Sequence, residues 1–451
     1  MRKTALAILL IAFLMPAAAR AQTDAAADNM TETVGNGIYD QLNLFGEAFD
    51  RIHHDAVDPV TYEHLVQTAI AGMLASLDPH SAYLTEQQYE ALEAHTPQTS
   101  GTTGLAVTID NSQLEVVSPR DGSPAAKADI TPGDIIYTIN KEPTYGQSLP
   151  EVEEMLSGPV GSTAKLVMRG TTDKPITVSL KRVAGPFPTV NYALKDGDIG
   201  YIRLAGFETA TPDLLAAAVK TLQQQAGGKL IGFVLDLRND PGGDFAAAVK
   251  CASDFLNKGD IALIKSRTPA DVKHIAATGG DLANGQPIVA LVNGGTAGVA
   301  ELVAGALQDN KRAVLLGSKT FGESAITTLI PLNGAGAIRL TTARFLTPDG
   351  HEIEGKGLTP NLTVSPLKLQ KVVESDGLRE ADLPGAMKNP DQTAVKSTGG
   401  AARMPTVTAP AKGEQSAVAT KDIGTTNDEQ LTEAEDVLRG LALIARQTAS
   451  R

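Results

Sequence analysis

The chain has 451 residues, of which 42% are hydrophobic and 20% are charged, and its formal net charge is -13. A chain of this length and composition can bury the cores of two or three domains, which excludes a largely disordered protein. The negative charge argues against nucleic acid as a partner and against charge-driven binding to an anionic membrane surface.

The N-terminus has the pattern of a cleaved export signal. Basic residues precede an apolar stretch over residues 5–15, and the small-residue motif A-R-A follows at 19–21. This order predicts a signal peptide over residues 1–21 and a mature chain that begins at Gln22. The apolar stretch is too short to span a membrane as a helix. We therefore expect an exported, periplasmic protein with no transmembrane segment in its mature chain.

Residues 22–98 are expected to form a helical N-terminal segment. Apolar residues recur at helical spacing from Ile38 to Ile52, and a second amphipathic helix is expected from about Pro59 to Met73. The segment contains the histidines His53, His54, His64 and His80. They lack the Cys or carboxylate neighbours of a metal site, so we expect them to be structural or solvated.

Short strand patterns replace the helices over residues 99–185. They cover residues 105–109, 114–117, 135–139, 164–168 and 176–180, with a short helix at 149–156. Turn sequences separate the strands, which predicts a small, partly open barrel. The helix-turn sequence at 123–128 and the Pro-Gly-Asp strand entry at 132–136 give this unit its resemblance to a PDZ domain.

A PDZ domain takes an extended C-terminal peptide as an added strand and holds its carboxylate on backbone N–H groups. The resemblance implies a peptide-binding loop that includes Gly104, Leu105, Ala106 and Val107. The corresponding loop of similar peptidase-linked PDZ domains reads F-G-G-L-G-I, and Thr103 and Ala106 replace two of its glycines. Capture of a carboxylate and use of the domain as a packing module both stay open.

Residues 186–366 alternate between strands and helices, which predicts a mainly parallel sheet covered by helices. Strands are expected at 201–204, 230–236, 288–292 and 313–316, and helices at 212–225, 246–256 and 299–307. The single cysteine, Cys251, lies in the second of these helices and is expected to be a buried structural thiol. Gly242 and Gly243 lie between a strand and a helix, where unobstructed N–H groups can support an anion or oxyanion.

Residues 367–427 are rich in Lys, Ala, Thr, Gly and Pro, and we expect a partly disordered linker there. Residues 428–451 are expected to contain a final amphipathic helix, with Leu431, Leu438 and Leu441 on its apolar face. Such a helix needs a surface that covers this face, either on its own chain or on another subunit.

The order of a helical segment, a PDZ domain and an α/β core resembles the carboxyl-terminal processing peptidases, also called tail-specific proteases. These are exported serine enzymes with a Ser-Lys dyad and no metal or organic cofactor. The resemblance covers about residues 38–364. Besides the PDZ domain it rests on the motifs S-L-D-P-H-S-A-Y-L at 76–84, L-D-L-R-N-D-P-G-G at 235–243, A-G-A-L-Q-D at 304–309, K-T-F-G at 319–322 and L-T-T-A-R-F-L-T-P at 340–348.

The chain differs from this family at the catalytic positions that the resemblance implies. The nucleophile loop of the family reads N-x-G-S-A-S-A-S-E, and the residue that corresponds to its middle Ser is Gly298. The basic Lys of T-F-G-K corresponds to Glu323, and the Gln that orients this Lys corresponds to Thr327. Glu323 could act as a base, but Gly298 has no hydroxyl for it to activate.

The sequence therefore favours a pseudoprotease that binds peptide C-termini, unfolded segments or a partner protein without cutting them. The partner could be an active relative or a second copy of the chain. An alternative is an active serine- or threonine-type endopeptidase with a displaced nucleophile, Thr296 or Ser324, although about 1 Å of misplacement can cost roughly 100-fold in rate. A second alternative is a structural scaffold that binds no peptide.

Overall fold

A computed structural model describes residues 18–93, 100–169, 175–268, 271–365, 423–425 and 428–449, with side chains from residue 37 to residue 444 within these ranges. Residues 1–17 of the expected signal peptide and most of the expected linker therefore lie outside the described residues. The chain divides into two compact units, Met1–Met73 and Leu74–Arg451. In the described part of the chain, no helix combines the length and the apolar character needed to cross a membrane.

The first unit is helical, as expected. It contains α1 (Ala18–Asp55) and most of α2 (Tyr62–Ala75). The ring of His53 stacks on that of Tyr62 with 3.7 Å between centroids. The same histidine places Nδ1 2.7 Å from the carbonyl oxygen of Val60. His53 thus has a structural role in holding the turn between the two helices.

The second unit begins with the PDZ domain, whose main sheet has the strand order β3-β4-β5-β8-β9, with β6 paired to β5. Its elements are β2 (Ser100–Gly101), β3 (Leu105–Asp110), β4 (Gln113–Pro119), α4 (Pro124–Lys127), β5 (Ile135–Ile139), β6 (Glu142–Pro143), α5 (Leu149–Leu156), β7 (Gly158–Pro159), β8 (Thr163–Arg169) and β9 (Pro175–Lys181). Ser148 and Glu151 mark the start of α5. The Glu151 carboxylate accepts the N–H of Ser148 at 2.7 Å, as in a capping box, and it also accepts the Ser148 hydroxyl at 2.7 Å.

The α/β core is built on a sheet of order β10-β11-β12-β15-β16-β19. Its strands are β10 (Val190–Lys195), β11 (Ile199–Leu204), β12 (Gly232–Asp236), β15 (Ile288–Val292), β16 (Ala313–Gly317) and β19 (Leu362–Thr363). All pairings from β11 to β19 are parallel, and β10 alone in this sheet runs antiparallel to its neighbour. The mainly parallel sheet predicted from the sequence is thereby confirmed.

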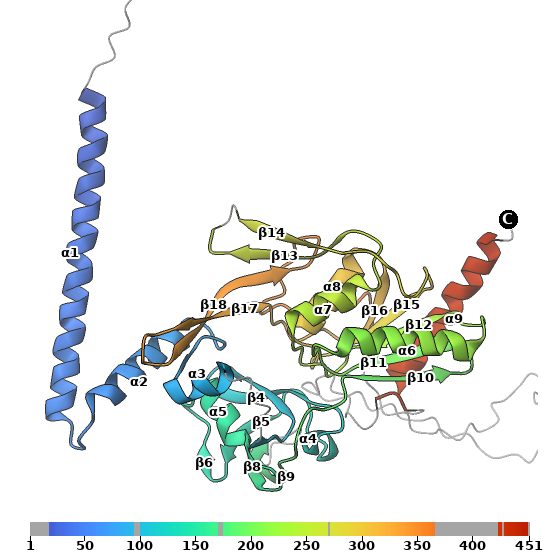
Figure 1. The fold of residues 1–451 in the computed structure, drawn as a ribbon, viewed down its shortest axis with the longest axis horizontal. Coiled ribbons are helices and arrows are strands. Elements are labelled where there is room, and N and C mark those ends of the chain that lie inside the picture. The colour runs from blue at the N-terminus through green and yellow to red at the C-terminus, as the bar shows by residue number, and fades with distance from the viewer. Residues whose placement is uncertain are drawn as a thin grey trace, which may run out of the picture. The chain divides into compact units, whose positions relative to one another are not determined.

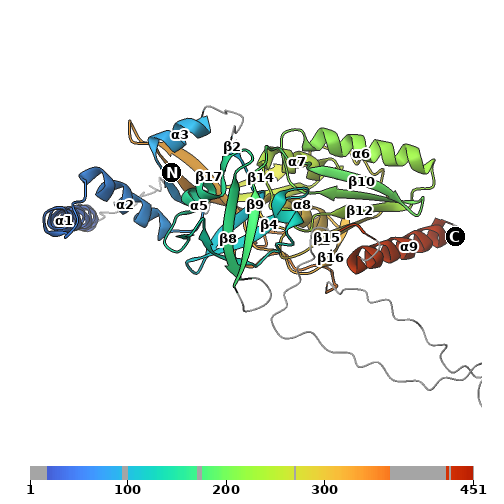
Figure 2. The same ribbon diagram turned by 90° about the horizontal axis from the view of Figure 1, so that it is seen from below.

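Helices cover both faces of this sheet (Figures 1 and 2). One face carries α6 (Thr211–Ala226), α7 (Phe245–Ser253) and α8 (Val299–Asp309), and the other carries α9 (Glu429–Ala449). Because side chains alternate along a strand, adjacent residues of β12 belong to different cores. Leu235 packs in the cluster under α6 to α8, whereas Val234 packs against α9.

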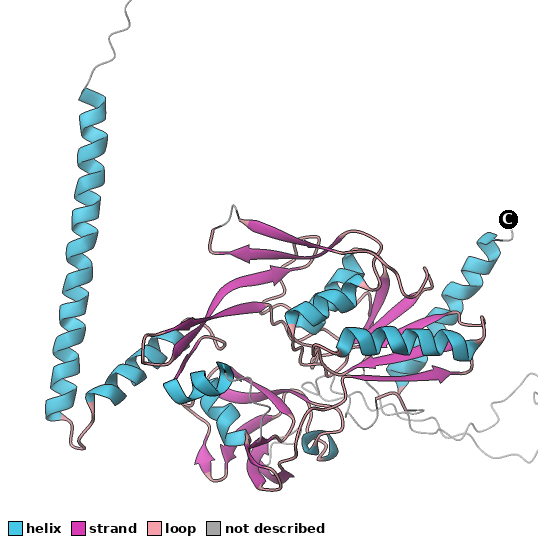
Figure 3. Ribbon diagram, in the orientation of Figure 1, coloured by secondary structure: helices cyan, strands magenta, loops and turns pink. Residues whose placement is uncertain are grey.

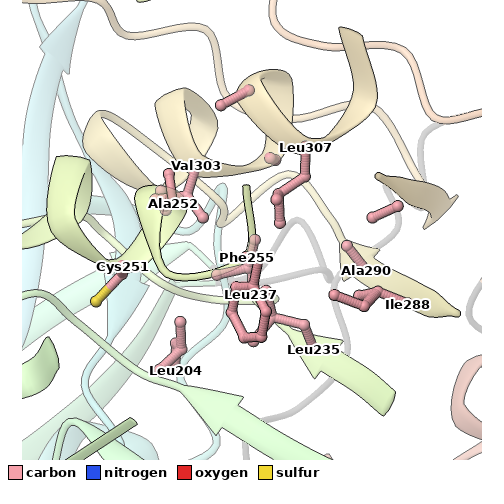
Figure 4. Close-up of a cluster of buried hydrophobic side chains, with 14 of the residues drawn as sticks. Leu204, Leu235, Leu237, Cys251, Ala252, Phe255, Ile288, Ala290, Val303 and Leu307 are labelled. Atoms are coloured by element: carbon pink, nitrogen blue, oxygen red, sulfur yellow. The ribbon is translucent and has the colours of Figure 1, made fainter. Parts of the chain in front are cut away.

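The larger of these clusters contains the fully buried Cys251, as expected for a structural thiol, together with Phe255 and Leu307 (Figure 4). The smaller cluster shows which surface covers the apolar face of the final helix, for which a surface of the same chain and one of another subunit were both considered. Leu431 and Leu438 of α9 are buried against the strands of their own chain.

A second sheet has the strand order β1-β18-β13-β14, with β17 also paired to β18 (Figure 3). Its strands are β1 (Ala82–Leu84), β13 (Asp260–Ser266), β14 (Val272–Ala276), β17 (Ala325–Pro331) and β18 (Ala337–Leu346), and α3 (Glu86–Glu93) follows β1. β13 and β14 are not among the strands predicted from the sequence. Most side chains of β14 are exposed, so this strand carries no apolar alternation. In β13, Ile261 and Ala262 are buried, but its short apolar run does not by itself distinguish a strand from a helix. This sheet matters for the site because β1 and β17 adjoin the loops that carry His80 and Glu323.

Candidate functional site

The turn between β15 and α8 is fixed by buried side chains. Asn293 Oδ1 accepts the N–H groups of Asn239 at 2.9 Å and of Gly295 at 3.0 Å. The hydroxyl of Thr296 accepts the Asn293 N–H at 3.0 Å. The turn ends at Gly298, which precedes the first residue of α8 with φ 56° and ψ -129°. A residue with a side chain rarely adopts such a conformation, so glycine relieves strain at this position.

Gly298 faces Glu323, although the two residues lie on different loops. A Cβ atom placed on Gly298 would lie 3.9 Å from the carboxyl carbon of Glu323, 4.0 Å from its Oε2 and 3.7 Å from the carbonyl oxygen of Pro241. The structure therefore brings together the two residues that the sequence predicts at the nucleophile and base positions. The groups that border this space are hydrogen-bond acceptors when Glu323 is ionised.

Glu323 also contacts a histidine that sequence reasoning did not connect with it. The Nδ1 atom of His80 lies 3.6 Å from Glu323 Oε1, and the His80 side chain is 15% exposed. Burial raises the pKa of Glu323, the charge of His80 opposes this rise, and the carboxylate of Glu354 adds to it. The signal that could have indicated His80 was its position inside the motif at 76–84.

A buried carboxyl group on α8 holds the loop of Glu323 in place. Glu301 is fully buried and accepts the N–H groups of Gly322 at 2.9 Å and of Glu323 at 2.8 Å, as well as the hydroxyl of Thr320. Burial raises the pKa of Glu301 to about 8, although these hydrogen bonds act in the opposite direction. Glu301 ends the nucleophile-loop motif, and this positioning role was not inferred from the sequence.

Both hydroxyls considered as displaced nucleophiles are engaged in hydrogen bonds. Thr296 is fully buried, and its Oγ1 donates to the carbonyl oxygen of Leu237 at 2.8 Å. Ser324 is 1% exposed and donates to Glu354 Oε2 at 3.0 Å. A nucleophile must reach the substrate carbonyl carbon at about 3–3.5 Å, which a buried and hydrogen-bonded hydroxyl does not do without movement of its loop.

The paired glycines expected to support an oxyanion lie in a tight loop after β12. The N–H of Gly242 donates to Asp240 Oδ1 at 2.8 Å. This amide is therefore engaged within its own loop, in contrast to the expectation of an unobstructed donor. A Cβ atom on Gly243 would lie 2.1 Å from the carbonyl oxygen of Phe207, so only glycine fits there. Burial raises the pKa of Asp240, which is fully buried, to about 8.

The predicted peptide-binding loop of the PDZ domain requires its glycine. Gly104 has φ 78°, and a Cβ atom on it would lie 2.2 Å from Ser123 Cβ. Its N–H donates to the Thr102 hydroxyl at 3.1 Å, and Leu105 pairs with Pro119 in the β3–β4 ladder. The loop is thus closely packed against the start of α4.

The PDZ groove meets the Glu323 loop in one cleft of about 260 Å³. Ala106 and Val107 of β3, Leu149 of α5, and the predicted catalytic positions Glu323 and Thr327 line this cleft. The structure therefore brings two of the four predicted peptide-binding residues and two of the three predicted catalytic positions to a single surface. A larger cleft, of about 690 Å³, shares His80, Thr108 and Glu323 with it.

Comparisons with known proteins identify the family. Residues 198–364 match peptidase family S41, residues 115–170 match a PDZ domain, and residues 11–88 match the N-terminal domain of the activating protease CtpB. The chain is 39% identical to a carboxy-terminal-processing protease of Bartonella bacilliformis, over 84% of this chain and 88% of that protein. The chain belongs to peptidase family S41.

Two further comparisons support this family assignment. The chain is 35% identical to a carboxyl-terminal-processing protease of Synechocystis, over 68% of this chain and 72% of that protein. It also resembles a solved structure described as a photosystem II D1 C-terminal processing protease, with a TM-score of 0.61 and 29% identity over 71% of this chain and 92% of that chain. The resemblance and the fold class inferred from the sequence are confirmed. Within the described residues, this S41 peptidase has no group of three or more His, Cys, Asp or Glu that could hold a metal ion.

Proposed function

We propose that this S41 peptidase is an exported, catalytically inactive member of its family that binds polypeptide C-termini or unfolded segments without cutting them. The observation that carries the proposal is the pair Gly298 and Glu323, which face each other with 3.9 Å between the Cβ position of one and the carboxyl carbon of the other. The sequence predicts the nucleophile and its base at these two positions.

The chemistry of this pair does not support acyl transfer. Covalent peptide hydrolysis needs a nucleophilic side chain and a base within hydrogen-bond reach of it. Glu323 can accept a proton, but Gly298 has none to give. In subtilisin, removal of the nucleophile alone lowers kcat by a factor on the order of 10⁶. A carboxylate beside the reacting carbonyl would also oppose the negative charge that develops on its oxygen.

The geometry of the PDZ domain supports the binding part of the proposal. In the described part of the chain, β3 pairs with β4 and forms the edge of its sheet. An edge strand beside a helix is the arrangement on which PDZ domains add a peptide strand. The groove between β3 and α5 opens onto Glu323 and Thr327. A bound segment could therefore extend from the PDZ groove to the former reaction site.

Export to the periplasm is part of the proposal because of the sequence of residues 1–21. The basic start, the apolar stretch and the A-R-A motif form a signal-peptide pattern, and such a leader would direct the mature chain across the inner membrane.

Incubation of the purified mature protein with a loosely folded protein that ends in an apolar C-terminus tests the absence of cleavage. Mass spectrometry of the mixture should find the substrate intact after prolonged incubation. Fragments that disappear in Thr296→Ala or Ser324→Ala would establish the displaced-nucleophile alternative and overturn the proposal. The variant Thr432→Ala, on α9 and far along the chain from both loops, is the matched control for loss of a hydroxyl.

A further inference from the structure

Glu323 forms part of the wall of the larger cleft, which is rich in carboxylates. The cleft of about 690 Å³ is lined by Asp110 and Glu115 of the PDZ strands and by Glu323 and Glu354 of the core, against the basic residues Lys319 and His80. A volume of this size lies within the range of pockets that hold a ligand group. The balance of charge inside the cleft is acidic.

The carboxylate of Glu323 is incompletely matched by positive charge. Within the described residues, its ion-pair contact is the imidazole of His80, at 3.6 Å, which carries a positive charge only when it is protonated. Glu354, whose Oε2 accepts both the N–H and the hydroxyl of Ser324 at 2.8 and 3.0 Å, adds a like charge beside it. A further cation at this point would therefore be favoured by both carboxylates.

The space above Gly298 adjoins the smaller cleft, which Pro241 and Glu323 both line, and it is bordered by oxygen atoms that accept hydrogen bonds. The carbonyl oxygen of Pro241 and Oε2 of Glu323 lie 3.7 and 4.0 Å from the Cβ position of Gly298. Among side chains that are cationic throughout the neutral pH range, the ammonium of Lys and the guanidinium of Arg carry only donors. A hydroxyl or amide would present at least one acceptor to these oxygens.

The larger cleft also contains a buried hydroxyl that has no partner in the described part of the chain. Ser318 follows β16, lines the larger cleft and is 9% exposed. Its Oγ has no hydrogen-bond partner in the described part of the chain. Buried polar groups of native proteins are rarely left without a partner, so this hydroxyl is available to a water molecule or to a polar group of a bound ligand.

We propose that this acidic cleft binds a lysine or arginine side chain of the captured polypeptide, and that its cationic group pairs with Glu323. The inference rests on the proposed function, because it assumes that a polypeptide is bound. It adds a selection for basic residues to the recognition of a chain end. At the position where active members of the family would form an acyl-enzyme, this chain would instead bind a charged side chain.

Peptide binding to the full mature chain, followed by fluorescence anisotropy, tests this inference. The probes are short peptides with a free C-terminus and an N-terminal label that blocks the amine. In each set one position carries Lys, uncharged norleucine or Glu, and that position is scanned along the peptide. At one register we expect the Lys peptide to bind about tenfold or more tightly than the norleucine peptide, since a hydrogen-bonded charge pair is worth about a factor of ten.

Variants of Glu323 assign this preference to the carboxylate. Glu323→Gln should abolish the preference for Lys over norleucine. Glu323→Lys should reverse the preference in favour of the Glu peptide. The control Glu142→Gln removes an exposed carboxylate on β6 that lines neither cleft, and it should keep the preference.

The outcomes separate the inference from the proposed function. Equal binding of the Lys and norleucine peptides at every register would overturn the basic-residue site and leave peptide capture standing. A preference that persists unchanged in Glu323→Gln and Glu323→Lys, both checked for folding by thermal unfolding, would also overturn it. Absence of binding by every peptide would overturn the binding part of the proposed function, and the inference with it.

Discussion

Arg238 and Asp428 are joined by two hydrogen bonds, 2.8 Å from Nη1 to Oδ1 and 2.6 Å from Nη2 to Oδ2, although 190 residues separate them in the chain. The same guanidinium contacts Asp236 at 2.6 Å, and all three side chains are buried. Arg238 belongs to the loop that leads to Gly242 and Gly243. The residue that precedes α9 is therefore tied directly to the loop beside the candidate site.

Removal of the Asp428 carboxylate should destabilise the protein markedly. Asp428→Ala deprives a fully buried guanidinium of one of its two carboxylates and the start of α9 of a side-chain acceptor for the Leu431 N–H. Breaking a buried pair in this way typically lowers the free energy of unfolding by about 3 kcal/mol. Urea unfolding followed by circular dichroism measures the loss.

An exposed pair on the same helix provides the control. Asp436 hydrogen-bonds Arg439 at 2.9 Å, but its side chain is 64% exposed. Asp436→Ala should therefore change the free energy of unfolding by less than about 1 kcal/mol. Equal effects of the two substitutions would mean that α9 does not depend on its contact with Arg238.

The double substitution Gly298→Ser with Glu323→Lys should restore some peptide hydrolysis. The nearest atom to a Cβ on Gly298 is 3.7 Å away, so a serine side chain has room. The positive φ should nevertheless cost about 1–3 kcal/mol of stability. The measurement is the appearance of substrate fragments by mass spectrometry, together with urea unfolding.

The matched control is Gly298→Ala with Glu323→Lys, which carries the same backbone strain and the same lysine without a hydroxyl. It should be as destabilised as the serine variant and inactive, as should each single variant. A folded Ser-Lys variant that yields no fragments would mean that activity needs more than these two side chains.

Asp240 should make the protein less stable as the pH rises. Burial is the main cause that raises its pKa from 3.8 to about 8. Between these values the unfolded chain has lost the proton that the folded protein retains, so the free energy of unfolding falls by about 1.4 kcal/mol per pH unit from this group. The contribution of the protonated Asp240 to the free energy of unfolding is therefore complete below pH 3.8 and is lost as the pH rises towards 8.

Asp240→Asn tests the origin of that slope. The asparagine keeps a carbonyl oxygen for the N–H of Gly242 but does not titrate. Urea unfolding at pH 5, 6 and 7 should give a shallower decline for the variant than for the wild type. Parallel declines would show that Asp240 is already ionised in the folded protein. Glu301, whose pKa is also raised to about 8, should leave a residual slope in both.

Two glycines of the PDZ domain separate the effect of backbone strain from that of close packing. Gly104 and Gly146 have φ of 78° and 81°, but a Cβ on Gly104 would lie 2.2 Å from Ser123 Cβ, whereas nothing lies within 4 Å of one on Gly146. Gly146→Ala should cost about 1 kcal/mol for its positive φ alone. Gly104→Ala should cost clearly more, because the start of α4 must move.

The same pair of variants tests recognition of a free carboxylate. Peptides that end in a carboxylate should bind the wild type and Gly146→Ala more tightly than the corresponding amides, as expected for capture on backbone N–H groups. Gly104→Ala should lose this difference because the loop is displaced. If the wild type bound the acid and amide peptides with equal affinity, the PDZ domain would not recognise a free carboxylate, and its role would be that of a packing module.

Local sequence patterns were sufficient for much of the fold. The apolar run 288–292 and the periodic run 299–307 predict β15 and α8 closely, since a buried strand and a buried helix each carry their own signature. The capping box at Ser148 likewise fixes the start of α5. By contrast, β13 and β14 are not among the predicted strands. β14 exposes most of its side chains and carries no alternation, and the short apolar run of β13 does not distinguish a strand from a helix.

The sequence by itself determined most of the order of elements and the family resemblance, because these are properties of neighbouring residues. It also predicts that Gly298, Glu323 and Thr327 occupy the catalytic positions of the family. Only the tertiary structure decided that His80 lies against Glu323, that Glu301 holds its loop and that α9 covers its own sheet. Each of these contacts joins segments far apart in the chain. Such contacts form only when the packing of several elements is satisfied at once, and no local periodicity records them.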